Sequence, residues 1–229
     1  DGIVIEASVV FKEQLEIARY CKQNFPDLEV VIGNVGSGSM VREIIEEGFQ
    51  YCDAIKIGMG PGAACITQQE LGTGRAQASA VWDCAQAVQN LAVKHGFLPL
   101  IADGGIKILD VVGADIEKPG DITKALALGA QTVMMGSILA GLDEAPGEQE
   151  FDYEANKMVK KYRGMGSLEA MEGTSAVRYA VDKVKIKIPE GIVTKVPYRG
   201  SGYDFLPKLI IGVKQSLQKQ GFRNIPELQ

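Results

Sequence analysis

The sequence is poor in zinc-binding residues and carries no excess of positive charge. It has one histidine, His95, and four cysteines without a C-x-x-C pair, which argues against a zinc site. Its 24 basic and 29 acidic residues give a net charge of −5, so no electrostatic signal for nucleic acid or an anionic membrane is present. No apolar run approaches the roughly 18 residues of a membrane span, and no signal-peptide pattern is found. We therefore expect a cytoplasmic protein with reduced cysteines that binds neither nucleic acid nor a membrane.

The chain has instead the composition of a globular α/β protein. Of its 229 residues, 46% are hydrophobic and 23% are charged. This length suits one large α/β domain or two small ones. The chain opens directly on an apolar strand and stops without an obvious closing element, so we expect it to be part of a larger protein.

Short apolar runs alternate with helical patterns over most of the chain. Near-continuous apolar strands separated by helices predict a parallel sheet that is covered on its outside. The expected strands lie near 3–7, 29–33, 54–57, 98–102 and 132–136. The expected helices lie over 11–25, 39–49, 77–94, 121–129 and 203–221, with Ser39 as the N-cap of the second.

Such a sheet occurs in doubly wound folds and in (β/α)₈ barrels. Polar or glycine-rich segments follow nearly every predicted strand, which is typical of the active face of a barrel. No G-x-G-x-x-G motif follows the first strand, which weakens the dinucleotide-fold alternative. We predict a (β/α)₈ TIM barrel, to which this chain supplies about five βα units.

The repeating pattern ends after residue 137. Residues 148–167 predict a hairpin with a turn near 154–156, and 178–200 contain alternating stretches without a clean helix or core strand. A long irregular insertion at the functional face of a domain is usually a lid or binding loop. We predict one partial barrel domain over 1–229, with a hairpin and lid over 148–200 before the last helix.

The segment GPGAACITQQELGTGRAQ (60–77) carries the most informative cysteine. A lone cysteine is more often a small buried hydrophobe than a nucleophile. Cys65, however, follows a predicted strand in a loop with Gly58, Gly60 and Gly62, where backbone N–H dipoles can stabilise a thiolate. The residues alone leave both interpretations open. The other cysteines lie within or beside helical or strand patterns and are interpreted as packing residues: Cys21, Cys52 and Cys84.

Two glycine-containing segments predict an anion site. DGG (103–105) and MGS (135–137) follow the last two predicted strands, where barrels commonly bind phosphate. The alternative is glycine used only for tight turns. Beside a phosphate, the carboxylate of Asp103 is suited to accept hydrogen bonds from sugar hydroxyls.

Together these segments resemble the IMP dehydrogenase and GMP reductase family. The most specific matches are GMGPGAACITQ (58–68) and KKYRGMGSLEAM (160–171). The others are GRAQASAV (74–81), IADGGI (101–106), DITKALALGAQTVMMGSILAG (121–141), EAPGE (144–148) and RYAVDKVKIKIPEGI (178–192). The resemblance implies strands four to eight of a barrel, with the first three strands, any CBS-domain pair and the C-terminal tail outside this chain.

The resemblance implies an enzyme that oxidises IMP to xanthosine monophosphate while NAD⁺ accepts a hydride. Cys65 would attack C2 of the base, and water would hydrolyse the resulting thioimidate. Arg178 matches the family's base for that water, with Tyr179 and Thr67 beside it. A guanidinium is normally always protonated, so the lid would have to supply an unusual environment for Arg178.

The resemblance also implies the binding residues and a homotetramer. A potassium ion would be bound by the carbonyl groups of Gly60, Gly62 and Cys65. NAD would contact Glu6, Asn34, Gly58, Met59 and Gly60. IMP would contact Ala63, Asp103, Gly104, Gly105, Gly136, Ser137, Tyr162, Gly164, Met165, Gly166 and Glu190. Of these, Asp103 would bind the ribose, and Met165, Gly166 and Glu190 would contact the base.

The sequence departs from the family pattern at three places. Ala63 stands where the family has a serine that touches phosphate. Glu6 stands where the family has an aspartate that binds the nicotinamide ribose. Residues 107–120 are an insertion after 103–105. These departures concern the NAD and phosphate contacts and leave the chemistry in place.

Two alternative functions differ in class. GMP reductase shares the cysteine loop and the barrel, but it reduces GMP to IMP with NADPH and needs no water step. Arg178, Tyr179 and the stretch 162–171 favour the dehydrogenase. The non-enzymatic alternative is a barrel fragment that only binds a nucleotide or a partner.

Overall fold

The computed structural model of the chain describes residues 1–6, 11–106, 109–111, 114–116, 119–172 and 188–229. These residues form two compact units. The first unit comprises Asp1–Pro61, Thr73–Asp103 and Leu128–Met134, and the second comprises Gly62–Gly72, Gly104–Ala127 and Met135–Gln229. The first unit contains a parallel sheet and the second an antiparallel one.

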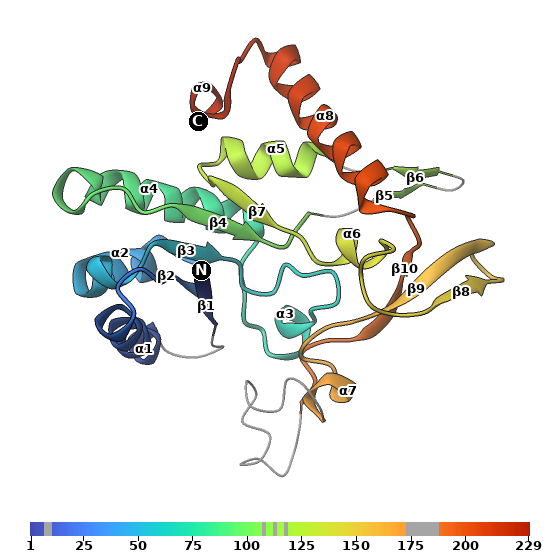
Figure 1. The fold of residues 1–229 in the computed structure, drawn as a ribbon, viewed down its shortest axis with the longest axis horizontal. Coiled ribbons are helices and arrows are strands. Elements are labelled where there is room, and N and C mark those ends of the chain that lie inside the picture. Colours follow the sequence, from blue (N-terminus) through green and yellow to red (C-terminus); the bar gives the residue numbers. More distant parts are fainter. Residues whose placement is uncertain (7–10, 107–108, 112–113, 117–118, 173–187) are drawn as a thin grey trace. The chain divides into compact units, whose positions relative to one another are not determined.

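A five-stranded parallel sheet forms the centre of the first unit (Figure 1). Its strands lie in the order β1 (Gly2–Glu6), β2 (Glu29–Val35), β3 (Ala54–Ile57), β4 (Leu100–Asp103) and β7 (Thr132–Met134). The order therefore never reverses along the chain. A doubly wound sheet reverses its strand order at a switch point, so this order favours the singly wound arrangement of a barrel. The predicted α/β class with a parallel sheet is confirmed, and the closed barrel stays a prediction.

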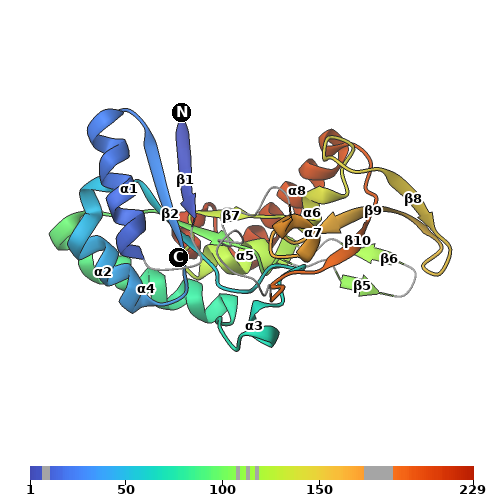
Figure 2. The ribbon, with the colours of Figure 1, turned by 90° about the horizontal axis from the view of Figure 1, so that it is seen from below.

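Helices connect neighbouring strands of this sheet, and three of those described belong to the first unit. They are α1 (Phe11–Asn24), α2 (Gly38–Gly48), which continues into the 3₁₀ turn η1 (Phe49–Tyr51), and α4 (Gln77–His95). Right-handed crossovers between strands in an unreversed order place successive helices on one face of the sheet. Figure 2 shows α1 and α2 on the same side of β1 and β2. The core of the unit includes Val30, Ile32, Ile55, Ile57, Leu100 and Ala102 from the strands and Val41, Ile44, Ala80 and Val88 from the helices.

The N-cap of α2 differs from the prediction. The cap is Ser37, whose hydroxyl accepts a hydrogen bond from the N–H of Met40, and not Ser39. An N-cap residue has extended backbone geometry, and Ser37 has φ −144° and ψ 152°. The helix consequently begins at Gly38, one residue earlier than predicted.

The second unit contains a three-stranded antiparallel sheet in the order β10–β9–β8. The predicted hairpin is formed by β8 (Gln149–Asp152) and β9 (Lys157–Arg163), joined by a turn over 153–156. The third strand, β10 (Val193–Pro197), pairs with β9 and was not isolated by the sequence pattern. A separate hairpin of β5 (Leu109–Val111) and β6 (Ala114–Ile116) lies in the predicted insertion.

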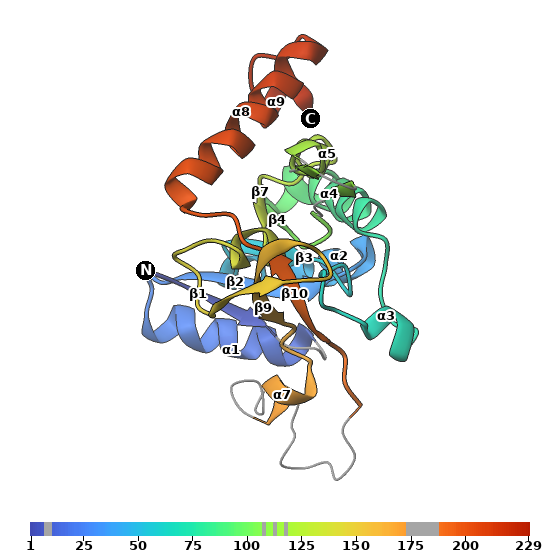
Figure 3. The same cartoon turned by 90° about the vertical axis from the view of Figure 1, so that its right-hand side faces the viewer.

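Two longer helices belong to the second unit. α5 (Pro119–Ala127) packs against α8 (Gly202–Gln220), where the missing side chain of Gly212 makes room for Pro119. α8 continues as one helix across Pro207 (Figure 3). The short helices are α3 (Thr67–Glu70), α6 (Ser137–Ala140), α7 (Leu168–Met171) and α9 (Ile225–Leu228). Within the part of the chain that the structure describes, none of the helices has the length and apolar character needed to cross a membrane.

Replacement of Gly129 tests the close packing of the segment before β7 against Ala85 of α4 within the first unit. Gly129 has φ +105°, and a Cβ there would lie 2.5 Å from the Cβ of Ala85. We expect Gly129→Ala to lower the free energy of unfolding by about 2–4 kcal/mol, from backbone strain and overpacking together. Gly221→Ala is the control, because Gly221 has φ +81° with open space around it and should cost only about 1 kcal/mol. Urea denaturation measures both, and equal losses would contradict the close contact with Ala85.

Candidate functional site

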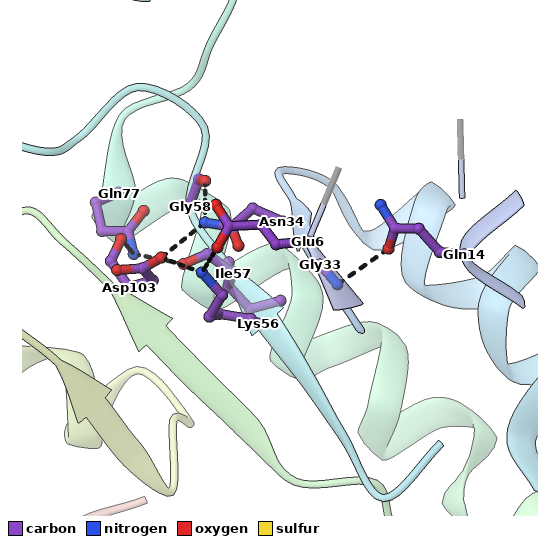
Figure 4. Close-up of polar contacts among 9 residues, drawn as sticks. All are labelled: Glu6, Gln14, Gly33, Asn34, Lys56, Ile57, Gly58, Gln77 and Asp103. Atoms are coloured by element: carbon purple, nitrogen blue, oxygen red, sulfur yellow. Dashed lines mark hydrogen bonds and ion pairs between the residues drawn. The ribbon is translucent and has the colours of Figure 1, made fainter. Parts of the chain in front are cut away.

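Polar side chains gather at the carboxyl ends of the parallel strands of the first unit (Figure 4). Glu6 ends β1, Asn34 lies near the end of β2, and Asp103 ends β4. The amide Nδ2 of Asn34 donates to the carbonyl oxygen of Gly58 at 2.8 Å and to Oδ2 of Asp103 at 2.9 Å. The structure thus brings Asn34 and Gly58, predicted to contact the cofactor, together with Asp103, predicted to bind the ribose.

Lys56 on β3 connects this cluster to Glu6. The Lys56 side chain is only 2% exposed, and its Nζ lies 2.9 Å from Oε2 of Glu6 and 2.6 Å from Oδ2 of Asp103. A buried ammonium group requires carboxylate partners, because its desolvation is costly. Lys56 is not among the site residues predicted from the sequence. The available signal was a lone lysine inside an otherwise apolar strand, DAIKIG (53–58).

The glycines that follow β3 and β4 adopt conformations that other residues rarely adopt. Gly58 has φ +149°, and a Cβ there would collide with the backbone oxygen of Asp103. Gly104 and Gly105 have φ +79° and +78°. Gln77, at the start of α4, donates its side-chain amide to a carbonyl at the end of each strand, at 2.9 and 3.1 Å. The glycine at position 58 therefore allows the ends of β3 and β4 to approach each other closely.

The first unit also contains acceptors suited to a dinucleotide cofactor. Oδ1 of Asn34 and Oε1 of Gln77 are buried and have no hydrogen-bond partner among the described residues. A buried acceptor without a partner is costly, and a hydroxyl or carboxamide of NAD carries donors that would satisfy it. Met59, also predicted to contact NAD, lies against Gly36. The donor and acceptor chemistry of these residues fits NAD.

The loop that carries Cys65 is fixed by backbone pairing within the second unit. Residues 64–66 pair with 190–192 through hydrogen bonds of 2.8 and 2.9 Å, and Cys65 faces Gly191 in an antiparallel bridge. The segment 190–192 pairs in turn with the segment 164–166, through backbone hydrogen bonds of 2.9 to 3.0 Å. This pairing brings Cys65, Glu190, Gly164 and Gly166 together, as four residues of the predicted substrate site.

The thiol of Cys65 begins a short chain of hydrogen bonds. Its Sγ lies 3.1 Å from Oγ1 of Thr67, and Oγ1 donates to Oε2 of Glu190 at 3.0 Å. A hydroxyl carries one hydrogen, which Thr67 gives to Glu190, so the thiol of Cys65 is the donor to Thr67 in this arrangement. Glu190 was predicted to contact the purine base of the substrate, and its hydrogen bond with Thr67 was not predicted.

Two predicted phosphate residues also meet in the second unit. The hydroxyl oxygen of Tyr162 lies 2.9 Å from the position that a Cβ on Gly136 would take, so it faces the backbone before α6. Ser137 is the first residue of α6. Ala63 and Met165 are both exposed. Arg178 and Tyr179 lie outside the described residues.

The predicted potassium ligands are backbone carbonyl groups. Carbonyl oxygens are hard donors that replace the hydration shell of a monovalent cation, so Gly60, Gly62 and Cys65 fit potassium in donor chemistry. Gly60 has φ +81°, which glycine tolerates. In the described ranges, no group of three or more His, Cys, Asp and Glu side chains could bind a metal ion.

Comparison with known proteins decides the family. A model of the IMP dehydrogenase / GMP reductase domain matches residues 1–229. The chain belongs to this family. Inosine-5'-monophosphate dehydrogenase 2 of Arabidopsis thaliana is 45% identical over 208 residues, which are 91% of this chain and 38% of that protein. The family resemblance inferred from the cysteine loop and from 160–171 is thereby confirmed.

Two bacterial members of this family are similarly related. Inosine-5'-monophosphate dehydrogenase of Halalkalibacterium halodurans is 41% identical over 230 residues, covering 100% of this chain and 43% of that protein. The Aquifex aeolicus protein of the same name is 41% identical over 219 residues, covering 95% of this chain and 41% of that protein. The chain therefore spans about two fifths of the length of the curated relatives it matches.

Cys65 is the cysteine that we expect a thiol reagent to modify. Cys65 is half-buried, whereas Cys21, Cys52 and Cys84 are buried. Burial raises the pKa of Cys52 and of Cys84 to about 12, which suppresses their thiolates. Brief treatment with iodoacetamide should label Cys65 at least roughly tenfold faster than the others. Peptide mass mapping measures this, with urea-unfolded protein as the control in which all four react. Equal labelling of the folded protein would contradict the expectation.

Proposed function

We propose that the protein containing this chain is an NAD-dependent IMP dehydrogenase, which supplies xanthosine monophosphate for GMP synthesis. The observation that carries the proposal is the hydrogen-bonded chain of Cys65, Thr67 and Glu190. It gives a partly exposed thiol a fixed orientation, with a carboxylate two hydrogen bonds away. Membership of a family whose relatives are named IMP dehydrogenases supports IMP as the substrate.

The first half of the reaction uses Cys65. C2 of the hypoxanthine ring does not release hydride readily until a nucleophile has added to it. Sγ of Cys65 forms a bond to C2, and the thiol proton passes through the Thr67 hydroxyl to the carboxylate of Glu190, which later releases it to solvent. NAD⁺, when bound, supplies the acceptor for the hydride that leaves C2. The substrate is then bound to Cys65 as a thioimidate.

The second half of the reaction uses water. A water molecule adds to C2, the C–S bond breaks, and xanthosine monophosphate is released with recovery of the Cys65 thiol. Arg178, with Tyr179 beside it, accepts the proton of that water and returns it to the sulfur. Because free guanidinium is a very weak base, Arg178 requires a lid environment that favours its neutral form.

The remaining site residues bind and orient the reactants. Asp103 accepts hydrogen bonds from the ribose, and Met165, Gly166 and Glu190 contact the base beside Gly164. The phosphate is bound by Gly105, Gly136, Ser137 and Tyr162, and Gly104 and Ala63 also contact IMP. NAD contacts Glu6, Asn34, Gly58, Met59 and Gly60, and potassium is bound by Gly60, Gly62 and Cys65. The closed barrel, the homotetramer and the cytoplasmic location belong to the same proposal.

Replacement of Cys65 tests the covalent step. In the full-length protein, Cys65→Ala should lower kcat by more than about 10³-fold, because the hydride is not released without prior addition of sulfur. IMP binding, measured by calorimetry, should persist, since most proposed ligand contacts come from other residues. IMP should also protect Cys65 from alkylation. Cys21→Ala is the control and should retain turnover. A Cys65→Ala protein with normal turnover would rule out the mechanism.

Replacement of Arg178 separates the dehydrogenase from a reductase. Arg178→Ala should spare hydride transfer and slow hydrolysis of the thioimidate by on the order of 10²–10⁴-fold. The expected stopped-flow trace is a burst of NADH followed by slow turnover. If hydride transfer slows equally and no burst appears, Arg178 does not activate water. If the unsubstituted protein oxidises NADPH in the presence of GMP and does not convert IMP in the presence of NAD⁺, it is a GMP reductase.

A further inference from the structure

We propose that Lys56 is a positioning residue that fixes the carboxylate of Asp103 for recognition of the ribose hydroxyls of the substrate. The inference rests on the proposed function, because it requires that Asp103 bind the ribose of IMP. It assigns a role to a buried lysine that the mechanism above does not use.

Both hydrogen bonds to the Asp103 side chain end on the same oxygen. Oδ2 accepts from Nζ of Lys56 at 2.6 Å and from Nδ2 of Asn34 at 2.9 Å. Among the described residues, Oδ1 accepts no hydrogen bond, and the side chain of Asp103 is 24% exposed. Two donors on Oδ2 restrict rotation of the carboxylate and leave Oδ1 available to a ligand hydroxyl (Figure 4).

The sheet register explains why Lys56 can hold this position. Glu6 on β1, Gly33 on β2 and Lys56 on β3 are register partners in one row across the sheet. Gly33 has no side chain, so Glu6 and Lys56 reach each other across the intervening strand. A Cβ on Gly33 would come within 2.8 Å of the Cβ of Lys56. The ion pair with Glu6 therefore fixes one side of the ammonium group while the other side contacts Asp103.

Removal of the ammonium group would change the orientation of Asp103. Lys56 is the cation that contacts both carboxylates, which come from the ends of β1 and β4. Without it, Glu6 and Asp103 would repel each other across a partly buried space, and only the amide of Asn34 would still bind Oδ2. Asp103 would then lose the fixed direction of Oδ1.

The test measures ribose recognition in the full-length protein. The values of kcat and KM are measured for IMP and for its 2′-deoxy and 3′-deoxy analogues, in the unsubstituted protein and in the Lys56→Met variant. We expect Lys56→Met to raise KM for IMP by roughly 10- to 100-fold, the worth of a charge-assisted hydrogen bond. KM for the analogues that lack the recognised hydroxyl should change less than about threefold, and kcat should change less than KM. Lys56→Arg, which retains the positive charge, should recover part of the preference for ribose.

Two further variants separate positioning from a merely structural role. Gln14→Met removes another buried hydrogen bond to the same sheet, in which the N–H of Gly33 donates to Oε1 of Gln14 at 3.1 Å. It should lower stability and leave the ribose preference unchanged. If Lys56→Met does not fold, Glu6→Gln loosens the same ammonium group and should lower the ribose preference in the same direction, by a smaller factor.

The outcomes distinguish this inference from the proposed function. If the unsubstituted protein converts IMP but Lys56→Met or Glu6→Gln retains the full ribose preference, the role proposed for Lys56 is wrong and the proposed function stands. A rise in KM of equal size for IMP and for both deoxy analogues also overturns the role of Lys56, because that pattern indicates a general structural effect. A parent protein that neither binds nor converts IMP overturns both.

Discussion

The ammonium group of Lys56 must be neutralised inside the parallel sheet, and the polar end of the first unit is arranged around this constraint. A buried ion pair adds little net stability, because desolvation offsets much of the attraction, but loss of one partner is costly. The strands therefore end in carboxylates at Glu6 and Asp103, and the strand between Glu6 and Lys56 carries glycine at the same register position. What the ion pairs contribute is a fixed direction for the carboxylate at the end of β4.

The cysteine site of the second unit depends on backbone pairing instead. The loop of Cys65 is one of three paired segments, and glycine occurs where their backbones come closest. A Cβ on Gly164 would lie 2.6 Å from the carbonyl oxygen of Ala64, and one on Gly191 would lie 3.1 Å from the same atom. Because this pairing uses main-chain groups, the hydrogen bonds that position Cys65 do not depend on the side chain at position 63.

Apolar patterning was sufficient to predict the five parallel strands, since each is a short, mostly apolar run between helical patterns. It was insufficient where long-range pairing decides the structure. β10 has an alternating pattern, but its partner β9 lies about 30 residues earlier, beyond any local signal. Lys56 was missed because the residues that neutralise it come from strands distant in sequence. Cys65 and Asp103 were singled out because glycine segments lie beside the predicted strand ends, and their functional roles, like those of Arg178 and Tyr179, remain predictions.

Asp103 and Glu190 share one arrangement, although they belong to different units. In each carboxylate one oxygen accepts hydrogen bonds from the protein: Lys56 and Asn34 donate to Asp103, and Thr67 donates to Glu190. Within the described residues, the second oxygen of each accepts none. A carboxylate bound at one oxygen cannot rotate freely, so its other oxygen has a defined direction toward a ligand donor. Substrate selection in the proposed enzyme then depends partly on residues that never touch the substrate, because they set the orientation of those that do.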